Sequence, residues 1–504
     1  MNSKKSNIDY SMIMIVLGFV IVVIYYLSIA PDQSKKMIDL INGYIFSNLG
    51  SVYVLIVLIS LFLCIYIGVG SFGSIRLGDK KKEYSEFTWA AMMFCSSMSA
   101  GFIYWGSIEW VFHYMEPPFG IIPLSVDAVE YAATLPLFYW GFSAWGIYLI
   151  PAVAFAFLRY NLKKERFDVS IACKPLLGKY ADGVGGKIIN ILFLFGILGG
   201  TGTALGIGSP LVSASLHHLF GLNDTPMLRF WVIVVVTIIF TISAYNGMKK
   251  GIRILSNANI ILMLLMVIFA FLVGNKGFIL KMQTTSLGIL LDNYFKMSTY
   301  LEPVNGGGEA ESWLVFYWAW WLSYAIFMGL FIARISEGRT IRQVIFGGLV
   351  YGFAGSFSMF SVLGNFSMDL HLRGIVDVVK GVTENGGPAT VIELYSKMPL
   401  GTIFIIAILI TSILSMATSF DSAAYIMAMV SSKEVALSGS PDKRLTIFWS
   451  LIMAALPMAI MMFNGSLAHV QALSVILALP TCVIYIIIVI SCFKMISEYT
   501  SRSG

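Results

Sequence analysis

Apolar runs long enough to cross a lipid bilayer recur along the whole chain. A transmembrane helix needs about 20 predominantly apolar residues. Runs of this kind lie at 11–29, 52–70, 89–114, 132–157, 188–212, 229–245, 256–273, 312–332, 344–363, 401–429, 445–462 and 472–493. The mean hydropathy is +0.82, and only 12% of the 504 residues are charged. The sequence therefore predicts an all-α membrane protein with twelve transmembrane helices.

The basic residues are distributed unevenly between the predicted loops. Most of the 33 Lys and Arg residues fall at the N-terminus, at the C-terminus and in the loops that follow the even-numbered spans, such as 76–82 and 159–187. Cytoplasmic loops carry an excess of such residues. We therefore expect a multi-pass protein of the cell (inner, cytoplasmic) membrane, in contact with the lipid bilayer and with both termini cytoplasmic. The net charge of +6 then reflects topology, and nucleic acid is not expected as a partner.

The cysteines and histidines give no sign of a metal centre, a disulfide framework or a catalytic cluster. The five cysteines are scattered with no CxxC spacing, and the five histidines form no ligand pair at helical spacing apart from the adjacent His217 and His218. We therefore expect no enzyme activity and no cofactor, apart from a sodium ion as a coupling ion.

Four tryptophans fall within nine positions of one predicted span, at Trp313, Trp318, Trp320 and Trp321. At about 100° per residue, most of the aromatic side chains share one face of a helix. This face carries Trp313, Tyr317, Trp320, Trp321, Tyr324 and Met328. Aromatic faces attract a quaternary ammonium ion, which cannot be hydrogen-bonded, at about 0.5–2 kcal/mol each. Tryptophan is also enriched at membrane interfaces, so the run alone predicts either a cation cage or an aromatic belt.

Two acidic residues fall inside predicted spans, Glu109 in the third and Asp421 in the tenth. A carboxylate in a membrane is costly and marks a functional site by default. Either residue could instead accept hydrogen bonds from an unwound helix. Stretches of small residues at 96–101 and 199–208 predict either close helix packing or backbone that opens beside a cavity.

The tryptophan run and its surroundings resemble the betaine/carnitine/choline transporter family. The matching residues are Ser312, Trp313, Tyr317-Trp318 and Trp320-Trp321, followed by Ala333 to Thr340, with Leu314 where the family usually has threonine. A second similarity is the fourth-span pattern Trp140, Trp145 and Tyr148, in which Tyr139 and Ala144 replace a common histidine and proline. On one helix these three aromatics fall within about 140°, so we expect them to line one cavity.

The resemblance implies a core of two inverted five-helix repeats, at 89–273 (spans 3–7) and 312–504 (spans 8–12 and a short tail). The repeats follow an N-terminal tail and two peripheral helices at 1–88. The resemblance also implies that three copies of the chain assemble into a homotrimer. The intervening segment 274–311, too polar to span, is predicted to hold an interfacial helix. The implied substrate box consists of Trp140, Trp145, Tyr148, Trp320, Trp321 and Tyr324. Trp318, Trp313, Met328 and Glu109 are expected along the gate or pathway.

The coupling ion is ambiguous in the sequence. Sodium-coupled betaine members of the family bind sodium with the broken third span and a Thr-Ser pair in the tenth, which here gives Cys95, Met98, Thr418 and Ser419. Sodium-independent carnitine exchangers instead use an arginine and a methionine; this chain keeps Met328 but has Asn259 at the arginine position.

The expected function is secondary active transport of a quaternary ammonium compound (betaine, carnitine, γ-butyrobetaine or choline) by alternating access. Sodium symport is placed first and substrate exchange second. A receptor or channel with an aromatic cation cage is the more distant alternative.

Overall fold

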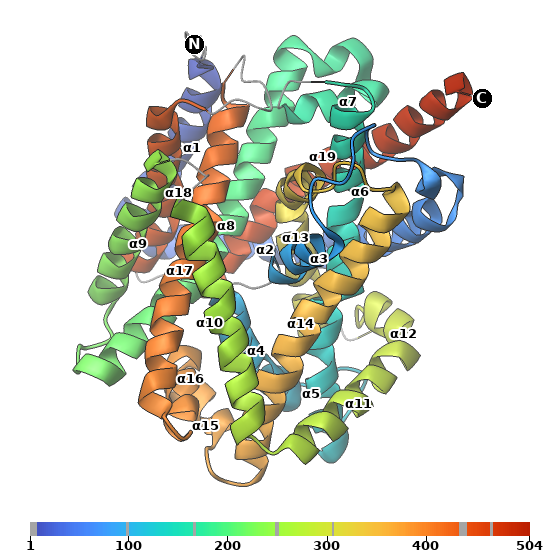
Figure 1. Cartoon of the computed structure of the whole chain (residues 1–504). Helices are drawn as coiled ribbons and strands as arrows, with labels where there is room; N and C mark the ends of the chain where they lie inside the picture. The colour runs from blue at the N-terminus through green and yellow to red at the C-terminus, as the bar shows by residue number, and fades with distance from the viewer. Residues whose placement is uncertain are drawn as a thin grey trace.

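The computed structural model describes residues 8–96, 100–164, 168–246, 251–304, 307–432, 441–463 and 467–503. The secondary structure of these residues is helical except for two isolated bridges, Ile8 with Ser432 and Arg76 with Thr340. Long helices form one bundle, and both chain ends lie at the same end of it (Figure 1).

Eleven helical segments of the described residues are long and apolar enough to cross a membrane. They are α1 (Tyr10–Ile29), α2 (Pro31–Val69), α5 with α6 (Val126–Tyr139 and Phe142–Tyr160), α8 (Gly183–Phe220), α9 (Pro226–Asn246), α10 (Gly251–Val273), α13 (Glu309–Arg334), α14 (Ile341–Leu372), α17 (Gly401–Val430), α18 (Lys443–Met462) and α19 (Leu467–Ser503). In the predicted third span the described residues belong to α3 (Glu86–Ser96) and α4 (Ala100–Met115), and residues 97–99 between them lie outside the described residues. The all-α membrane class is confirmed, and the count of twelve spans stays a prediction.

Shorter helices cover the ends of the bundle. Two of them, α11 (Lys276–Asp292) and α12 (Tyr294–Thr299), occupy the segment predicted to be interfacial. The others are η1 (Ser71–Ser74), α7 (Val169–Leu177), η2 (Gly178–Ala181), α15 (Val378–Glu384) and α16 (Gly387–Ser396). Helices α11, α15 and α16 lie at the end opposite the chain termini (Figure 1), and α11 packs against α5 and α14.

The helix pairs show that the core has two equivalent halves. Helix α4 packs on α14 and α13 packs on α6; likewise α10 packs on α17 and α19 packs on α8. The helices of the first half (spans 3–7) are α4, α6, α8, α9 and α10, and their counterparts in the second half (spans 8–12) are, in order, α13, α14, α17, α18 and α19. When each helix is replaced by its counterpart, the pair α4–α14 becomes α13–α6, and the pair α10–α17 becomes α19–α8. The remaining pairs, α8 with α17 and α9 with α18, map onto themselves. With α3 and α4 counted as the predicted third span, each half would have five spans, and the two halves would then cross the membrane in opposite directions, as predicted for inverted repeats.

The fourth span is interrupted where the sequence predicted a continuous helix. Helix α5 ends at Tyr139, Trp140 is its C-cap, and α6 begins only at Phe142. Gly141 permits the break, because a Cβ there would lie 2.4 Å from the carbonyl oxygen of Leu137. The helical arc drawn from Trp140 to Trp145 and Tyr148 was therefore wrong, and Trp140 is oriented by the break instead.

The glycines of the fifth span serve close packing. Helix α8 is continuous through 199–208, so the interpretation of this stretch as opened backbone was wrong. A Cβ on Gly199 would lie 3.0 Å from Leu477 of α19, and one on Gly208 would lie 2.5 Å from the sulfur of Met416 in α17. The missing side chains let α19 and α17 approach the α8 backbone.

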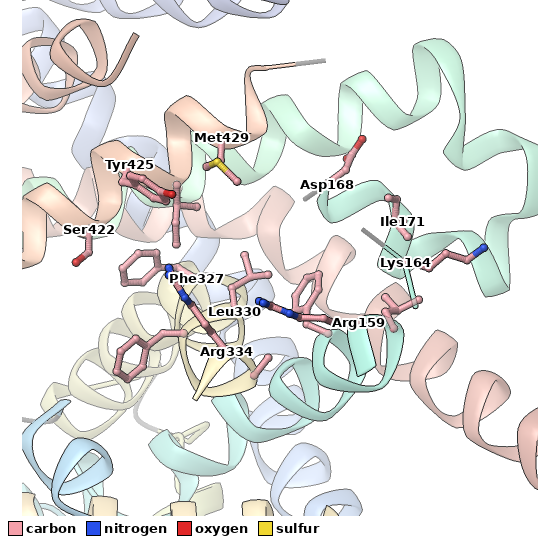
Figure 2. Close-up of a pocket in the computed structure, with 15 residues that line it drawn as sticks. Arg159, Lys164, Asp168, Ile171, Phe327, Leu330, Arg334, Ser422, Tyr425 and Met429 are labelled. Atoms are coloured by element: carbon pink, nitrogen blue, oxygen red, sulfur yellow. The ribbon is translucent and has the colours of Figure 1, made fainter. Parts of the chain in front are cut away.

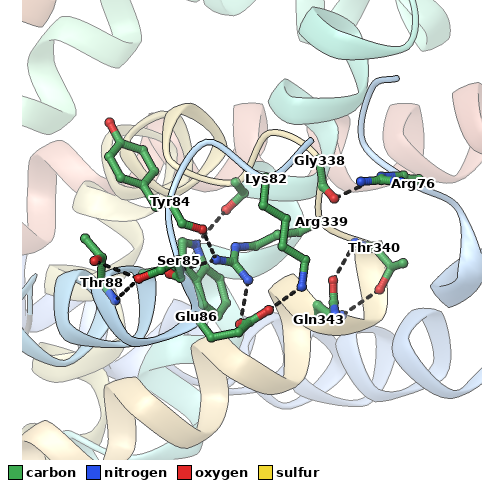
Figure 3. A network of polar contacts seen from close by, with 12 residues as sticks. Arg76, Lys82, Tyr84, Ser85, Glu86, Thr88, Gly338, Arg339, Thr340 and Gln343 are labelled. Carbon is green, nitrogen blue, oxygen red and sulfur yellow. Dashed lines mark hydrogen bonds and ion pairs between the residues drawn. The ribbon is translucent and has the colours of Figure 1, made fainter. Parts of the chain in front are cut away.

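A polar network joins the start of α3 to the loop between α13 and α14 (Figure 3). The guanidinium of Arg339 is 1% exposed; it donates to Glu86 Oε2 at 2.7 Å and to the Tyr84 carbonyl at 3.0 Å, and its Cζ lies 4.2 Å from the centroid of the Trp89 ring. The hydrogen bond from Lys82, assisted by Arg339, lowers the pKa of Glu86. The network ties the first helix of one half to the loop after the first helix of the other.

Candidate functional site

Three indole rings of the predicted box form one buried cluster between the two halves of the core. The centroid of Trp140 lies 4.7 Å from that of Trp321 and 5.8 Å from that of Trp320, in edge-to-face arrangements. Trp320 and Trp321 stack at 4.8 Å with an interplanar angle of 15°. All three rings are buried. The end of α5 and the middle of α13 therefore place an aromatic wall at the interface between the repeats.

The polar edges of these indoles are already used by the protein. Trp321 Nε1 donates to the Tyr139 carbonyl at 3.0 Å, and Trp320 Nε1 donates to the Gly200 carbonyl at 3.4 Å. Trp140 Nε1 donates to Glu109 Oε2 at 3.0 Å. The N–H groups are thus satisfied by the protein, so a cation would be attracted by the ring faces, which carry negative electrostatic potential. In this structure Trp320 and Trp321 stack on each other and on Phe316 and Tyr317.

The other three predicted box residues lie further along α6 and α13. Trp145 and Tyr148 are in contact with ring centroids 5.9 Å apart, and the Tyr148 and Tyr324 phenols are close enough to interact electrostatically. Gly352 of α14 seats Trp145, since a Cβ there would lie 2.2 Å from the indole. The six residues thus form two groups, one around Trp140 and one around Tyr148, rather than one ring.

Two phenylalanines that the sequence did not single out complete the wall around Trp140. Phe102 of α4 lies 4.4 Å from the Trp140 ring, and Phe360 of α14 lies 5.2 Å from it, by centroids. They contact each other at 5.5 Å. Phe102 directly follows the small-residue stretch 96–101, and that position was the one available signal for it.

Aromatic side chains fill the bundle on the side where α13 begins. Trp313 contacts Trp105, Phe112 and His113 with centroids 5.0–5.6 Å apart. Trp318 is 1% exposed and packs against Phe138 and Tyr139, away from the box. Met328 is half-buried on α13. The gate residues are thus spread over several faces of α13, and their roles stay predictions.

At the opposite end of α13 a cavity of about 110 Å³ opens to solvent. Helices α6, α13 and α17 supply its apolar wall with Phe155, Phe327 and Tyr425, and its polar side chains include Arg159, Lys164, Asp168 and Arg334. Figure 2 shows the two guanidinium groups between these helices. We call this cavity the vestibule. The vestibule lies beyond Tyr148 on α6 and beyond Tyr324 on α13. This is the end of the helix bundle at which both chain termini lie.

The predicted sodium ligands are only partly visible. Met98 and the side chain of Cys95 lie outside the described residues. Thr418 Oγ1 donates to the Leu414 carbonyl of its own helix at 2.9 Å, and Ser419 is exposed on α17. These four residues stay candidates.

Asn259, at the position of the exchangers' arginine, lies beside that region. It is 3% exposed, and its Nδ2 donates to Ser415 Oγ at 2.8 Å, one turn before Thr418 and Ser419. Its Oδ1 is buried with no hydrogen-bond partner among the described residues. Asp421, also on α17, is 1% exposed and faces Ser243 of α9. Asn259 therefore lies one helical turn from the predicted sodium ligands of α17, and its role stays a prediction.

Comparison with known proteins identifies the chain's family. A model of the betaine/carnitine/choline family transporter matches residues 11–501. The chain belongs to this family. It is 31% identical over 494 residues to the glycine betaine transporter OpuD of Bacillus subtilis (strain 168), covering 97% of this chain and 94% of that protein. It is 29% identical to the uncharacterized transporter YeaV of Escherichia coli (strain K12), covering 86% of this chain and 90% of that protein.

A solved structure of a Na⁺-coupled sialic acid symporter aligns with 82% of each chain, at 12% identity and a TM-score of 0.40. That likeness is too small to bear on the fold or the ion of this protein. Membership of the betaine/carnitine/choline family makes the chain a multi-pass membrane transporter and not an enzyme. The Trp140, Trp320 and Trp321 cluster therefore belongs to a transporter, at the interface of its two repeats.

Proposed function

We propose that this transporter carries a quaternary ammonium compound by alternating access, with the Trp140, Trp320 and Trp321 cluster holding the ammonium head. The observation that carries the proposal is the meeting of these three rings from two helices, with their N–H groups satisfied by the protein. Each ring contributes about 0.5–2 kcal/mol to binding a cation. The similarity to a glycine betaine transporter over nearly the whole chain favours betaine among such compounds.

Sodium symport is the coupling that we propose. A positively charged side chain at position 259 would occupy the ion region itself, whereas Asn259 is neutral and keeps a buried Oδ1 without a hydrogen-bond partner among the described residues. Sodium is a hard cation that binds such oxygens together with hydroxyl and carbonyl groups. Sodium-independent exchange is the second candidate, favoured by Met328 on α13. Cytoplasmic termini and a homotrimeric assembly complete the proposal.

Uptake into proteoliposomes tests the proposal. Labelled betaine, carnitine and choline are offered with and without an inward sodium gradient, and with and without unlabelled substrate inside. We expect uptake of at least one of them that requires sodium and not internal substrate. Uptake that requires internal substrate and ignores sodium would establish exchange instead. No accumulation of any quaternary ammonium compound would contradict the proposed substrate class.

The ion region has its own variants. Thr418→Val and Ser419→Ala remove one hydroxyl each, and we expect both to raise the sodium concentration that gives half-maximal uptake. Thr411→Val serves as the matched control, because Thr411 is a buried α17 residue whose hydroxyl bonds to the Ala407 carbonyl, two turns before Thr418. An unchanged sodium requirement in both test variants would remove these hydroxyls from the sodium site.

A further inference from the structure

Glu109 and His113 form a buried pair beside the aromatic cluster that the proposed function does not yet use. They lie one turn apart on α4 and are 0% and 2% exposed. Glu109 Oε2 accepts two hydrogen bonds, from the Tyr317 hydroxyl at 2.6 Å and from Trp140 Nε1 at 3.0 Å. The carboxyl group is therefore attached directly to a ring of the proposed box.

The second oxygen of Glu109 faces the imidazole. Glu109 Oε1 and His113 Nε2 lie 3.7 Å apart, and neither has a hydrogen-bond partner among the described residues. Both donors to this carboxyl group are neutral, and a buried carboxylate whose negative charge is not balanced by a nearby positive charge is disfavoured. One proton removes this cost, either as Glu109⁻ with protonated His113 or as neutral Glu109 with neutral His113. In both forms the pair has no net charge, and without the proton it has a charge of −1.

We propose that the Glu109–His113 pair is a proton-binding site that holds one proton while the box is empty and releases it when a quaternary ammonium cation enters. The inference rests on the proposed function, because it needs a cation in the box. For a singly charged cation such as choline, the entering charge of +1 replaces the leaving charge of +1, so the buried region stays neutral. The proton passes to water, and the carboxylate left behind becomes the counter-ion of the bound ammonium group through the edge of Trp140.

The groups around the pair are consistent with a site that holds a proton when empty. Tyr139 of α5 lies 5.6 Å from His113 by ring centroids, and Tyr317 of α13 donates to the carboxyl group. Other titratable side chains that approach α4 are Glu309 of α13, which interacts with His113 and Glu116, Tyr395 of α16, which meets Ser107, and His371 of α14, which meets Trp110 and Tyr114. The negative charges of Glu309 and Glu116 disfavour a further uncompensated negative charge on Glu109.

Proton release on binding is the direct test. Purified full-length protein is titrated with choline, a cation with no group that titrates near neutral pH, by calorimetry in two buffers of different ionisation enthalpy. We expect about one proton released per choline bound, and a Kd that falls about tenfold per unit rise in pH while the pair is protonated. Glu109→Gln should bind choline without releasing a proton, and with a Kd that no longer changes with pH.

Glu116→Gln is the matched control, since Glu116 is an exposed residue just beyond the end of α4; it should release a proton as the wild type does. If Glu109→Gln does not fold, Glu109→Met, which also removes the carboxyl group, replaces it with the same expected loss. Wild-type choline binding with no proton release, or full release from Glu109→Gln, overturns the proton site and leaves the proposed substrate class intact. No binding of choline or betaine at all would instead contradict the proposed function.

Discussion

The two ends of the proposed substrate path differ in construction. Toward the start of α13, Trp313, Trp105, Phe112 and His113 pack ring against ring. Toward the end of α13, the vestibule opens to solvent between α6, α13 and α17, with Arg159 and Arg334 among its polar side chains. One end is closed by aromatic packing, and the other is an open cavity.

The difference indicates which state of the transport cycle the structure represents. Alternating access requires that one end of the path be closed while the other is open. Here the open end is the one that carries both chain termini (Figure 1), which the distribution of basic residues predicts to be cytoplasmic. The repeats are joined near this end by the Arg339 and Glu86 network, so opening of the vestibule does not require that contact to break.

Removing a ring from the box should have the largest effect. Trp321→Leu deletes a face next to Trp140 and Trp320 and leaves the Tyr139 carbonyl without its donor. We expect uptake to fall about tenfold or more, because a lost cation–π contact costs about 0.5–2 kcal/mol and a buried cavity adds to it. Uptake by protein of verified folding is the measurement. Trp231→Leu, at an exposed indole of α9, is the control and should transport normally.

The rate at which a thiol reagent modifies introduced cysteines should distinguish the two ends of the path, and this is the second-largest effect that we expect. In a background in which Cys95 is replaced by Ala, Ser422→Cys places a thiol in the vestibule, and Ser107→Cys places one where Ser107 and Tyr395 meet at 2.6 Å. A membrane-impermeant thiol reagent should modify position 422 at least about tenfold faster than position 107 in protein without substrate. Equal rates would show that the aromatic end is not closed in solution.

Adding a methyl group where Gly352 contacts the Trp145 indole should have an intermediate effect on uptake. Gly352→Ala puts a Cβ within 2.2 Å of the indole, and overpacking of a buried site costs about 1–3 kcal/mol. We expect uptake to fall about three- to tenfold as Trp145 is displaced. Gly288→Ala on α11, where a Cβ meets nothing within 4 Å, should leave uptake unchanged. If both variants behave alike, Trp145 has no part in the path.

The sequence predicted the membrane class and the aromatic residues of the box, because apolar runs and tryptophan density are local signals. It did not predict that Trp140 lies at a helix break, since Gly141 acts through contact with the Leu137 carbonyl. It also missed Phe102 and Phe360, which become neighbours of Trp140 only when α4 and α14 pack together. For the glycines of α8 the pattern allowed two interpretations, and the partners on α17 and α19 decided between them.

The smallest effects are expected in the network that joins the repeats. Arg339→Lys keeps the charge but loses donors to Glu86 and to the Tyr84 carbonyl, which should lower the free energy of unfolding by about 1 kcal/mol. Glu86→Gln should cost less, because Glu86 is 57% exposed and exposed ion pairs contribute little. The apparent melting temperature of the purified protein orders the two variants. A larger loss for Glu86→Gln would contradict this description.

The central claim is that aromatic faces bind a quaternary ammonium charge at Trp140, Trp320 and Trp321. The most direct measurement compares the binding of glycine betaine with that of 3,3-dimethylbutanoate, which has the same shape with carbon in place of the charged nitrogen. Cation–π attraction from three rings predicts that betaine binds about tenfold or more tightly, and that the preference shrinks in Trp321→Leu. Equal binding of the two compounds, or tighter binding of the carbon analogue, would contradict the claim.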